Sequence, residues 1–115
     1  MMRNSKNMKK KKIESYLGLA RRAGKIVSGY QTCVHTISKG NIKLIIVASD
    51  ASENTRDRFK NLCSRYGVEF EVYGTVDTLS QMTGFTGRGI YGITDRNFAE
   101  VMIKEIQNEK LISEE

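Results

Sequence analysis

The sequence predicts a small α/β protein, a three-layer α/β/α sandwich built on a mixed sheet of about four strands. Segments whose apolar residues follow a helical period alternate with short segments typical of strands. Residues 42–48 are almost continuously apolar and rich in β-branched side chains, which indicates a central strand buried on both sides. The chain has 115 residues, the length of one domain.

Up to this central strand, the chain predicts a helix, a short strand and a second helix. Residues at helical spacing mark the first helix: Ile13, Tyr16, Leu17 and Ala20. Gly24 ends this helix as a left-handed cap would, and residues 25–28 form the short strand. Gly29 opens the second helix and Gly40 closes it. One face of this helix carries Cys33, Val34 and Ile37.

A third helix follows the central strand. Either Asp50 or Ser52 caps it, and Glu53 is placed to complete a capping box with Asp50. Its amphipathic stripe ends at Gly67 and consists of Phe59, Leu62, Cys63 and Tyr66.

The last part of the chain predicts two strands and two helices. In residues 68–73 apolar side chains alternate with glutamates and a tyrosine, which indicates a half-solvated strand near a sheet edge. A short helix at residues 76–82, a glycine-rich stretch at 84–89 and a short strand at 90–93 follow. The C-terminal helix is lined by Phe98, Val101, Met102 and Ile106.

Positive charge is concentrated near the N-terminus. The chain has 19 Lys and Arg against 13 Asp and Glu, a net charge of +6. Residues 1–25 hold nine bases and one acid, so this segment is +8 and the remaining ninety residues are −2. The asymmetry predicts a polyanionic partner, because each base that neutralises a phosphate releases a counterion. A basic tail that only improves solubility is the alternative.

Composition excludes several classes of protein. No stretch approaches the roughly 18 apolar residues of a membrane span. The N-terminal lysines are not followed by the apolar segment of a secretory signal. Two cysteines and one histidine do not make a disulfide scaffold or a zinc site, and they fit free thiols in a reducing cytoplasm. We therefore expect a cytoplasmic protein without a metal or other cofactor.

Motifs for nucleotide binding and catalysis also fail. Residues 18–25 resemble a phosphate-binding loop, but they have five residues between the glycines and no hydroxyl residue after the lysine. The glycines of residues 84–89 follow a helix and precede a strand, the reverse of a dinucleotide-binding turn. Cys33 and His35, two residues apart on a helix, diverge by about 200° and cannot act as a pair. We expect no catalytic residues and no enzyme activity.

One constellation remains, where a basic strand leads into the second helix. It consists of Lys25, Ser28, Gly29, Tyr30, Gln31, Thr32 and His35. Amides at a helix start bind anions, and a glycine there lets a phosphate backbone approach closely. Gln31 offers a donor and an acceptor to a base edge, Thr32 can bond sugar, base or phosphate, and His35 lies one turn beyond Gln31. Spacing alone equally allows solvated side chains without a ligand.

Two runs in this region resemble a known family. Residues 22–29 read Arg-Ala-Gly-Lys-Ile-Val-Ser-Gly, and residues 39–50 read Lys-Gly-Asn-Ile-Lys-Leu-Ile-Ile-Val-Ala-Ser-Asp. Both resemble the ribosomal protein superfamily of the L7Ae and L30e type, and more narrowly its small bacterial members. The resemblance extends over about residues 12–107, in the same element order. It implies an α/β/α sandwich that binds RNA, typically a kink-turn, a helix–bulge–helix element closed by tandem G·A pairs.

The resemblance also implies where RNA binds. In the family, the helix that begins at the position of Gly29 enters the widened groove and contacts the guanines. A loop before the last strand covers the extruded bulge nucleotide. The regions implied here are residues 29–35 and 84–90, the second including Gly87, Arg88, Gly89 and Ile90.

Three residues in or near these regions have particular roles in this hypothesis. Arg88, between two glycines, suits a mobile loop in which it stacks on an unpaired base or pairs with phosphate. Ile90 would add an apolar shelf. Asp50 stands where family members often carry an acid that orders the binding face, although helix capping explains it equally well.

The helix start departs from the family pattern. Archaeal members carry Gly-Thr-Asn-Glu there, with a lysine three residues after the glutamate. In this chain Thr32 replaces the carboxylate and His35 replaces the lysine.

We expect residues 1–11 to form a flexible basic tail and residues 12–115 a single RNA-binding domain. The expected partner is structured RNA, for example ribosomal RNA or the ribosome, with no membrane or small-molecule substrate, and we expect a monomer. Two other classes stay open. One is a protein-interaction adaptor that uses the acidic C-terminal helix with Glu100, Glu105 and Glu109. The other is a small RNA-modifying enzyme or a fragment of one.

Overall fold

The computed structural model describes residues 12–113, and the predicted basic tail, residues 1–11, lies outside the described residues. Within this range the chain forms five helices and four strands. In chain order they are α2 (Lys12–Arg22), β1 (Ile26–Ser28), α3 (Tyr30–Ser38), β2 (Leu44–Val47), α4 (Glu53–Tyr66), β3 (Glu69–Val72), α5 (Val76–Thr83), β4 (Ile90–Ile93) and α6 (Arg96–Ser113). The predicted order of elements is confirmed.

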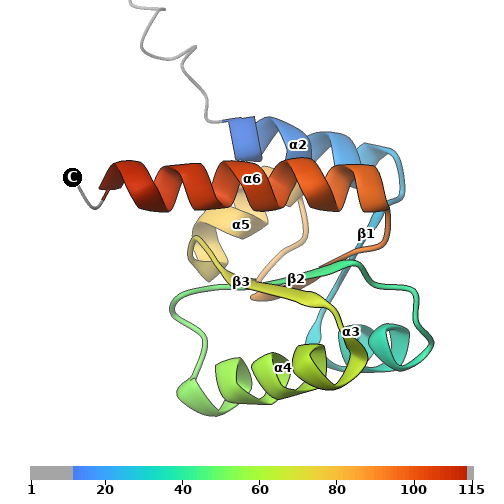
Figure 1. Ribbon diagram of the computed structural model, residues 1–115. Coiled ribbons are helices and arrows are strands. Elements are labelled where there is room, and N and C mark those ends of the chain that lie inside the picture. The colour runs from blue at the N-terminus through green and yellow to red at the C-terminus, as the bar shows by residue number, and fades with distance from the viewer. Residues whose placement is uncertain (1–11, 114–115) are drawn as a thin grey trace, which may run out of the picture.

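The four strands form one mixed sheet in the order β1-β4-β2-β3. β2 pairs parallel with β3 and antiparallel with β4, and β4 pairs antiparallel with β1. Helices α2, α5 and α6 cover one face of the sheet and α3 and α4 cover the other (Figure 1). The predicted α/β/α sandwich is thereby confirmed.

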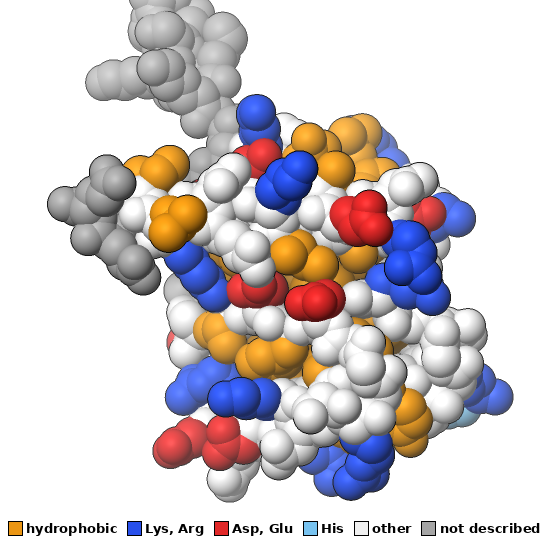
Figure 2. All heavy atoms as spheres, viewed as in Figure 1, with side chains coloured by type: hydrophobic (Ala, Val, Ile, Leu, Met, Phe, Trp, Pro, Cys, Tyr) orange, Lys and Arg blue, Asp and Glu red, His pale blue; other side chains and the backbone are white. Residues whose placement is uncertain are grey.

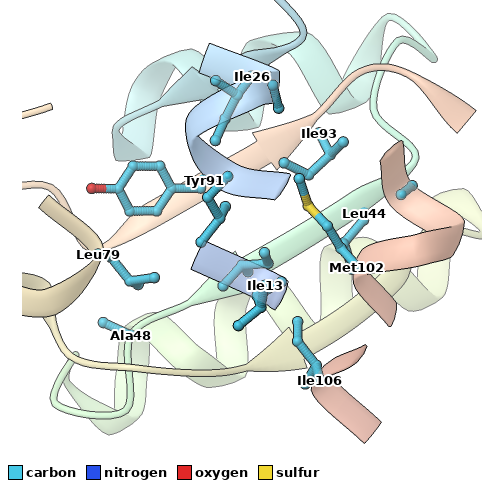
Figure 3. Close-up of a cluster of buried hydrophobic side chains, with 13 residues drawn as sticks. Ile13, Ile26, Leu44, Ala48, Leu79, Tyr91, Ile93, Met102 and Ile106 are labelled. Atoms are coloured by element: carbon cyan, nitrogen blue, oxygen red, sulfur yellow. The ribbon is translucent and has the colours of Figure 1, made fainter. Parts of the chain in front are cut away.

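β2 is buried on both faces, as its apolar run predicts. Leu44 and Ile46 belong to the core cluster beneath α2, α5 and α6. Ile45 and Val47 belong to the second cluster, against α3 and α4. Figure 3 shows the first cluster, whose helical members include Ile13, Leu79, Met102 and Ile106. Because successive strand side chains point to opposite faces, a strand between two helical layers needs apolar residues at every position.

The N-cap of helix α4 differs from the predicted capping box. Ser52 is the N-cap of α4, and its Oγ accepts the N–H of Thr55 at 3.1 Å. Asp50 instead accepts the N–H of Val76, the first residue of α5, at 3.0 Å. The predicted capping box of Asp50 with Glu53 is therefore wrong. Because β2 and β3 are parallel, the loop after β2 meets the start of α5 at the same edge of the sheet.

β3 is an edge strand, as predicted, but one of its acidic side chains is buried. Glu71 is only 9% exposed, because α6 covers it. Lys110 Nζ lies 2.9 Å from Glu71 Oε1, and Gln107 Nε2 donates to Oε2 at 3.3 Å. These partners compensate a carboxylate that would otherwise lose its hydration. The expectation of a solvated acidic face is wrong at this residue.

The apolar stripes of two helices are narrower than predicted. Tyr66 in the last turn of α4 is 43% exposed, and Val101 on α6 is 36% exposed. The buried stripe of α6 consists instead of Ala99, Met102 and Ile106, which face the sheet. Tyr66 and Val101 lie at the side of the apolar stripe of their helix. The period of apolar residues shows where the centre of such a stripe lies, but it does not show how far the contact with the sheet extends.

Candidate functional site

Helix α3 begins at a glycine with a backbone conformation that is essentially confined to glycine. Gly29 has φ 100° and ψ 152°, and it offers no side-chain cap to the helix. Its N–H donates to the carbonyl oxygen of Ile90 at 2.9 Å, so this amide is already used. The N–H groups of the following turn have no intrahelical acceptor, and the helix dipole adds partial positive charge. The helix start therefore favours an anion.

The glycine-rich loop between α5 and β4, residues 84–89, is tied to its surroundings by hydrogen bonds. The N–H of Gly87 donates to Ser80 Oγ at 3.1 Å. The hydroxyl of Tyr91 donates to the carbonyl oxygen of Arg88 at 2.9 Å. At the ends of the loop, the N–H of Gly84 donates to the carbonyl oxygen of Ser80, and the carbonyl oxygen of Gly89 accepts the N–H of Ala48. The loop backbone is thus held along its length, while the side chain of Arg88 remains exposed.

The loop and the start of α3 lie against each other. The guanidinium of Arg88 covers Gly29, because a Cβ placed on Gly29 would overlap Nη1 and lie 3.5 Å from Cζ. The Gly29–Ile90 hydrogen bond joins the same two segments. Gly89 fits closely as well, since a Cβ there would lie 3.0 Å from Val76 Cγ2. Two regions that are far apart in the sequence therefore form one continuous surface.

The predicted site residues divide by exposure. The exposed ones are Lys25, Tyr30, Gln31, Thr32, His35, Asp50, Gly87 and Arg88. Gly89 is partly buried, while Ser28, Gly29 and Ile90 are buried. The side chain of Ile90 is only 6% exposed and packs in the second core cluster, so it does not offer the expected apolar shelf. Its contribution to this region is the carbonyl that accepts from Gly29.

The orientation of α3 follows from its apolar side chains. Cys33 and Ile37 are fully buried against the sheet, and the ring of Tyr30 meets the buried Phe59 of α4 edge-on at 5.2 Å. These contacts leave Gln31 and His35, one turn apart, exposed to solvent. The helix thus presents its polar side chains to solvent, on the element whose first residue follows the Gly29–Arg88 contact.

Arg21, which the sequence alone did not assign to the site, connects α2 with Phe85 in the predicted loop region. Arg21 Cζ lies 3.9 Å from the ring centroid of Phe85, a cation–π contact. The Phe85 ring also packs 6.0 Å from the ring of Tyr91. An aromatic residue inside a glycine-rich stretch was the available signal, although its partner on α2 could not be read from the sequence.

The rejected Cys–His pair is separated in the structure. Cys33 is buried, whereas His35 is exposed. Burial, and secondarily Cys63, raises the pKa of the Cys33 thiol to about 12. Burial, with a smaller contribution from Glu69, raises the pKa of Cys63 to about 12. Both thiols are buried and free, and their raised pKa values favour the protonated form at neutral pH.

Because the pKa values of these two buried thiols are raised, we expect the protein to lose stability at alkaline pH. The unfolded chain releases their protons near the ordinary thiol pKa of 9.0, whereas the folded chain retains them to about 12. The free energy of unfolding should therefore fall as pH rises through this window. Urea unfolding measured from pH 8 to 11 tests this, and a Cys33→Ala, Cys63→Ala variant should show a flatter dependence. An equally steep loss in that variant would assign the effect to other groups.

The face formed by α6 and β3 is acidic and internally bonded. Figure 2 shows acidic side chains gathered between these two elements. The hydroxyl of Tyr73 donates to Glu109 Oε1 at 2.9 Å, and burial followed by this hydrogen bond raises the pKa of Tyr73. Of the three glutamates that an adaptor would use, Glu109 is thus engaged within the chain, Glu100 is exposed and Glu105 is partly buried.

Residues 12–113 do not form a membrane span or a cluster of metal ligands. None of the helices in this range combines the length and hydrophobicity that a membrane span requires. In the same range, no three His, Cys, Asp or Glu side chains gather as metal ligands would. The fold and the α3 region together define a small α/β/α protein in which a helix start, a cation and a glycine-rich loop lie on one surface.

The chain belongs to the ribosomal protein L7Ae/L30e/S12e/Gadd45 family, whose model matches residues 11–103. The RNA-binding protein YlxQ of Enterococcus faecium is 37% identical over 92 residues, which cover 79% of this chain and 87% of that protein. The RNA-binding protein YlxQ of Bacillus subtilis (strain 168) is 33% identical over 87 residues, covering 76% and 87%. The predicted family resemblance is confirmed.

A solved structure has the same fold. It is that of a protein with unknown function from Bacillus halodurans, with a TM-score of 0.83 and 28% sequence identity. The match covers 85% of this chain and 99% of that one.

Proposed function

We propose that this chain is a non-catalytic RNA-binding protein that holds a structured RNA, of the kink-turn type, on one surface. This α3–loop surface comprises residues 29–35 and residues 84–90. Lys25 lies at the other end of β1, where its carbonyl oxygen accepts the N–H of Thr94, and adds positive charge on that side of the molecule. The observation that carries the proposal is the contact of the Arg88 guanidinium with Gly29, which joins a cation to the helix start. Family membership and two relatives named as RNA-binding proteins support it.

Phosphate and base contacts have different sources on this surface. The first-turn amides of α3 and the guanidinium of Arg88 favour a phosphate group, by hydrogen bonds and charge together. The amide of Gln31 donates and accepts at a base edge, which is the contact that carries sequence information. Thr32 and His35 extend the polar stripe along the exposed side of α3.

A bent RNA fits this arrangement better than a regular duplex. The deep, narrow major groove of an A-form helix excludes side chains, so base edges become accessible where the RNA is bulged or bent. Gln31 lies on a helix, and Arg88 lies on the adjacent loop, so the two can contact neighbouring parts of such an element. Thr32 supplies a hydroxyl where a carboxylate would accept from guanine, and the resulting guanine contact is weaker.

The wider setting follows from the same proposal. Residues 1–11 act as a basic tail that adds affinity for any RNA, and residues 12–115 act as the binding domain. The protein works as a monomer in the cytoplasm, on ribosomal RNA or another structured RNA.

Replacing Gln31 with alanine tests the base contact. On a kink-turn RNA, a helix–bulge–helix element with tandem G·A pairs, Gln31→Ala should weaken binding by about 1–3 kcal/mol. On a plain duplex of equal length the same change should have little effect. Electrophoretic mobility shift or fluorescence anisotropy at fixed salt measures both affinities.

A matched variant separates base contacts from charge. Changing Lys9, Lys10, Lys11 and Lys12 to glutamine should weaken binding of the kink-turn RNA and of the plain duplex about equally. It should also reduce the slope of log affinity against log salt concentration. Equal losses for Gln31→Ala on the two RNAs would show that the start of α3 does not read the RNA. Failure of the wild type to bind either RNA at low salt would reject the proposed function.

A further inference from the structure

A groove lies between α2 and α5, and its residues are separate from those of the α3–loop surface. It has a volume of about 570 Å³ with both polar and apolar lining. Arg22 and Gln81 contribute charge and hydrogen-bonding groups, whereas Leu19 and Met82 contribute apolar surface. The volume is within the range of about 300–1,000 Å³ typical of small-ligand sites.

A glycine in the middle of α2 keeps the groove open. Gly18 is a lining residue, and a Cβ built on it would lie 3.8 Å from both Arg22 Nη1 and the carbonyl oxygen of Met82. These are ordinary contact distances, so alanine fits without displacing a neighbour. A longer side chain would enter the groove. The same distances place the guanidinium of Arg22 beside Gly18, one turn back along the helix.

The basic end of the groove adjoins the RNA-binding loop. Gly18 faces Met82, and Arg21, one turn further, stacks on Phe85 at the beginning of the loop. Helices α2 and α5 therefore run parallel, and Arg22 lies at the end of the groove that is nearer to the loop at residues 84–89. Glu14 also lines the groove, about 12 Å from Arg22 along the helix at 1.5 Å per residue. A negative charge at that end disfavours a second phosphate.

We propose that this groove holds one unpaired nucleotide of the RNA bound at the α3–loop surface. Its phosphate pairs with Arg22, its base stacks on the apolar surface of Leu19 and Met82, and Gln81 bonds its polar edge. The guanidinium of Arg21, which stacks on Phe85, lies between the loop and the groove and contacts the phosphate backbone of the RNA there. The proposal rests on the proposed RNA binding and adds a second contact region on α2.

Nucleoside monophosphates test the groove without any folded RNA. We expect titration of the full chain with AMP, GMP, CMP or UMP to shift ¹H–¹⁵N NMR signals of Ser15 and of the Gln81 side-chain amide. Gly18→Met, which fills the groove, should abolish these shifts, whereas Gly18→Ala should preserve them. Both substitutions replace a helical glycine with a better helix former, so thermal unfolding should show that each variant folds. Inorganic phosphate alone should shift only signals around Arg22.

The kink-turn RNA gives the second measurement and separates the two proposals. With an unpaired nucleotide beside the bulge, Gly18→Met should weaken binding about tenfold relative to Gly18→Ala, the effect of losing one stacked base. Shifts confined to α3 in the monophosphate titration, or equal RNA affinities of the two Gly18 variants, would overturn the groove proposal and leave the proposed function intact. Loss of binding in Gln31→Ala with no effect of Gly18→Met would likewise overturn the groove proposal alone. No binding by the wild type would reject the proposed function itself.

Discussion

Gly29→Ala is expected to destabilise the protein by about 1–3 kcal/mol and to weaken RNA binding by about tenfold or more. The stability loss follows from φ 100° and ψ 152°, a conformation that an alanine adopts only with strain. The binding loss has a separate cause. The new Cβ would occupy the position of Arg88 Nη1, so the guanidinium must leave the helix start. Urea unfolding measures the first effect and anisotropy with the kink-turn RNA the second.

Gly67→Ala is the matched control for backbone strain. Gly67 caps α4 with φ 70°, and a Cβ there would meet nothing within 4 Å. This variant should lose about 1–2 kcal/mol of stability and keep the wild-type RNA affinity. Comparable affinity losses in the two variants would show that destabilisation alone explains Gly29→Ala, and that the Arg88 contact has no part in binding.

Phe59→Ala should have the largest effect on stability, a loss of about 3–5 kcal/mol in the free energy of unfolding. Its side chain is fully buried in the cluster between α4 and the sheet, where the truncation leaves a cavity. The ring also supports Tyr30 at the first position of α3 by an edge-on contact of 5.2 Å. Since typical domains are stable by about 5–15 kcal/mol, this variant should be close to its limit of stability.

An exposed residue on the opposite side of the sheet is the comparison. Leu111 near the end of α6 is 62% exposed, and Leu111→Ala should change stability by less than about 0.5 kcal/mol. Thermal unfolding followed by circular dichroism measures both variants. If Phe59→Ala proved as mild as Leu111→Ala, the second core cluster would not be the support of α3 that its contacts indicate.

Local patterns in the sequence were sufficient to predict most of the secondary-structure elements and their order. The five-residue apolar run at residues 44–48, which contains β2, specified a strand between two helical layers, because only complete burial suits apolar residues on both faces. Helix ends were equally local, since Gly67 at the end of α4 needs only its own backbone conformation. The helix beginning after Gly29 and the loop at residues 84–89 were likewise visible as separate features of the sequence.

Long-range contacts decided the remainder of the site. Asp50 bonds to the start of α5 rather than to its own neighbour Glu53, because parallel strands bring those segments to one edge. Arg21 stacks on Phe85, and Glu71 is buried beneath α6 with Lys110 as its partner. Each pair joins residues far apart in the sequence, and a periodic pattern holds no information about such partners.

The amino-acid sequence by itself thus determined the elements, their order, the buried central strand and the two candidate binding segments. Only the tertiary structure decided that Arg88 rests on Gly29 and that a groove opens between α2 and α5. The physical reason is the range of the forces involved. Backbone preference and amphipathic period act over a few neighbouring residues, whereas the shape and charge of a binding surface arise where strands β1 and β4 bring distant segments into contact.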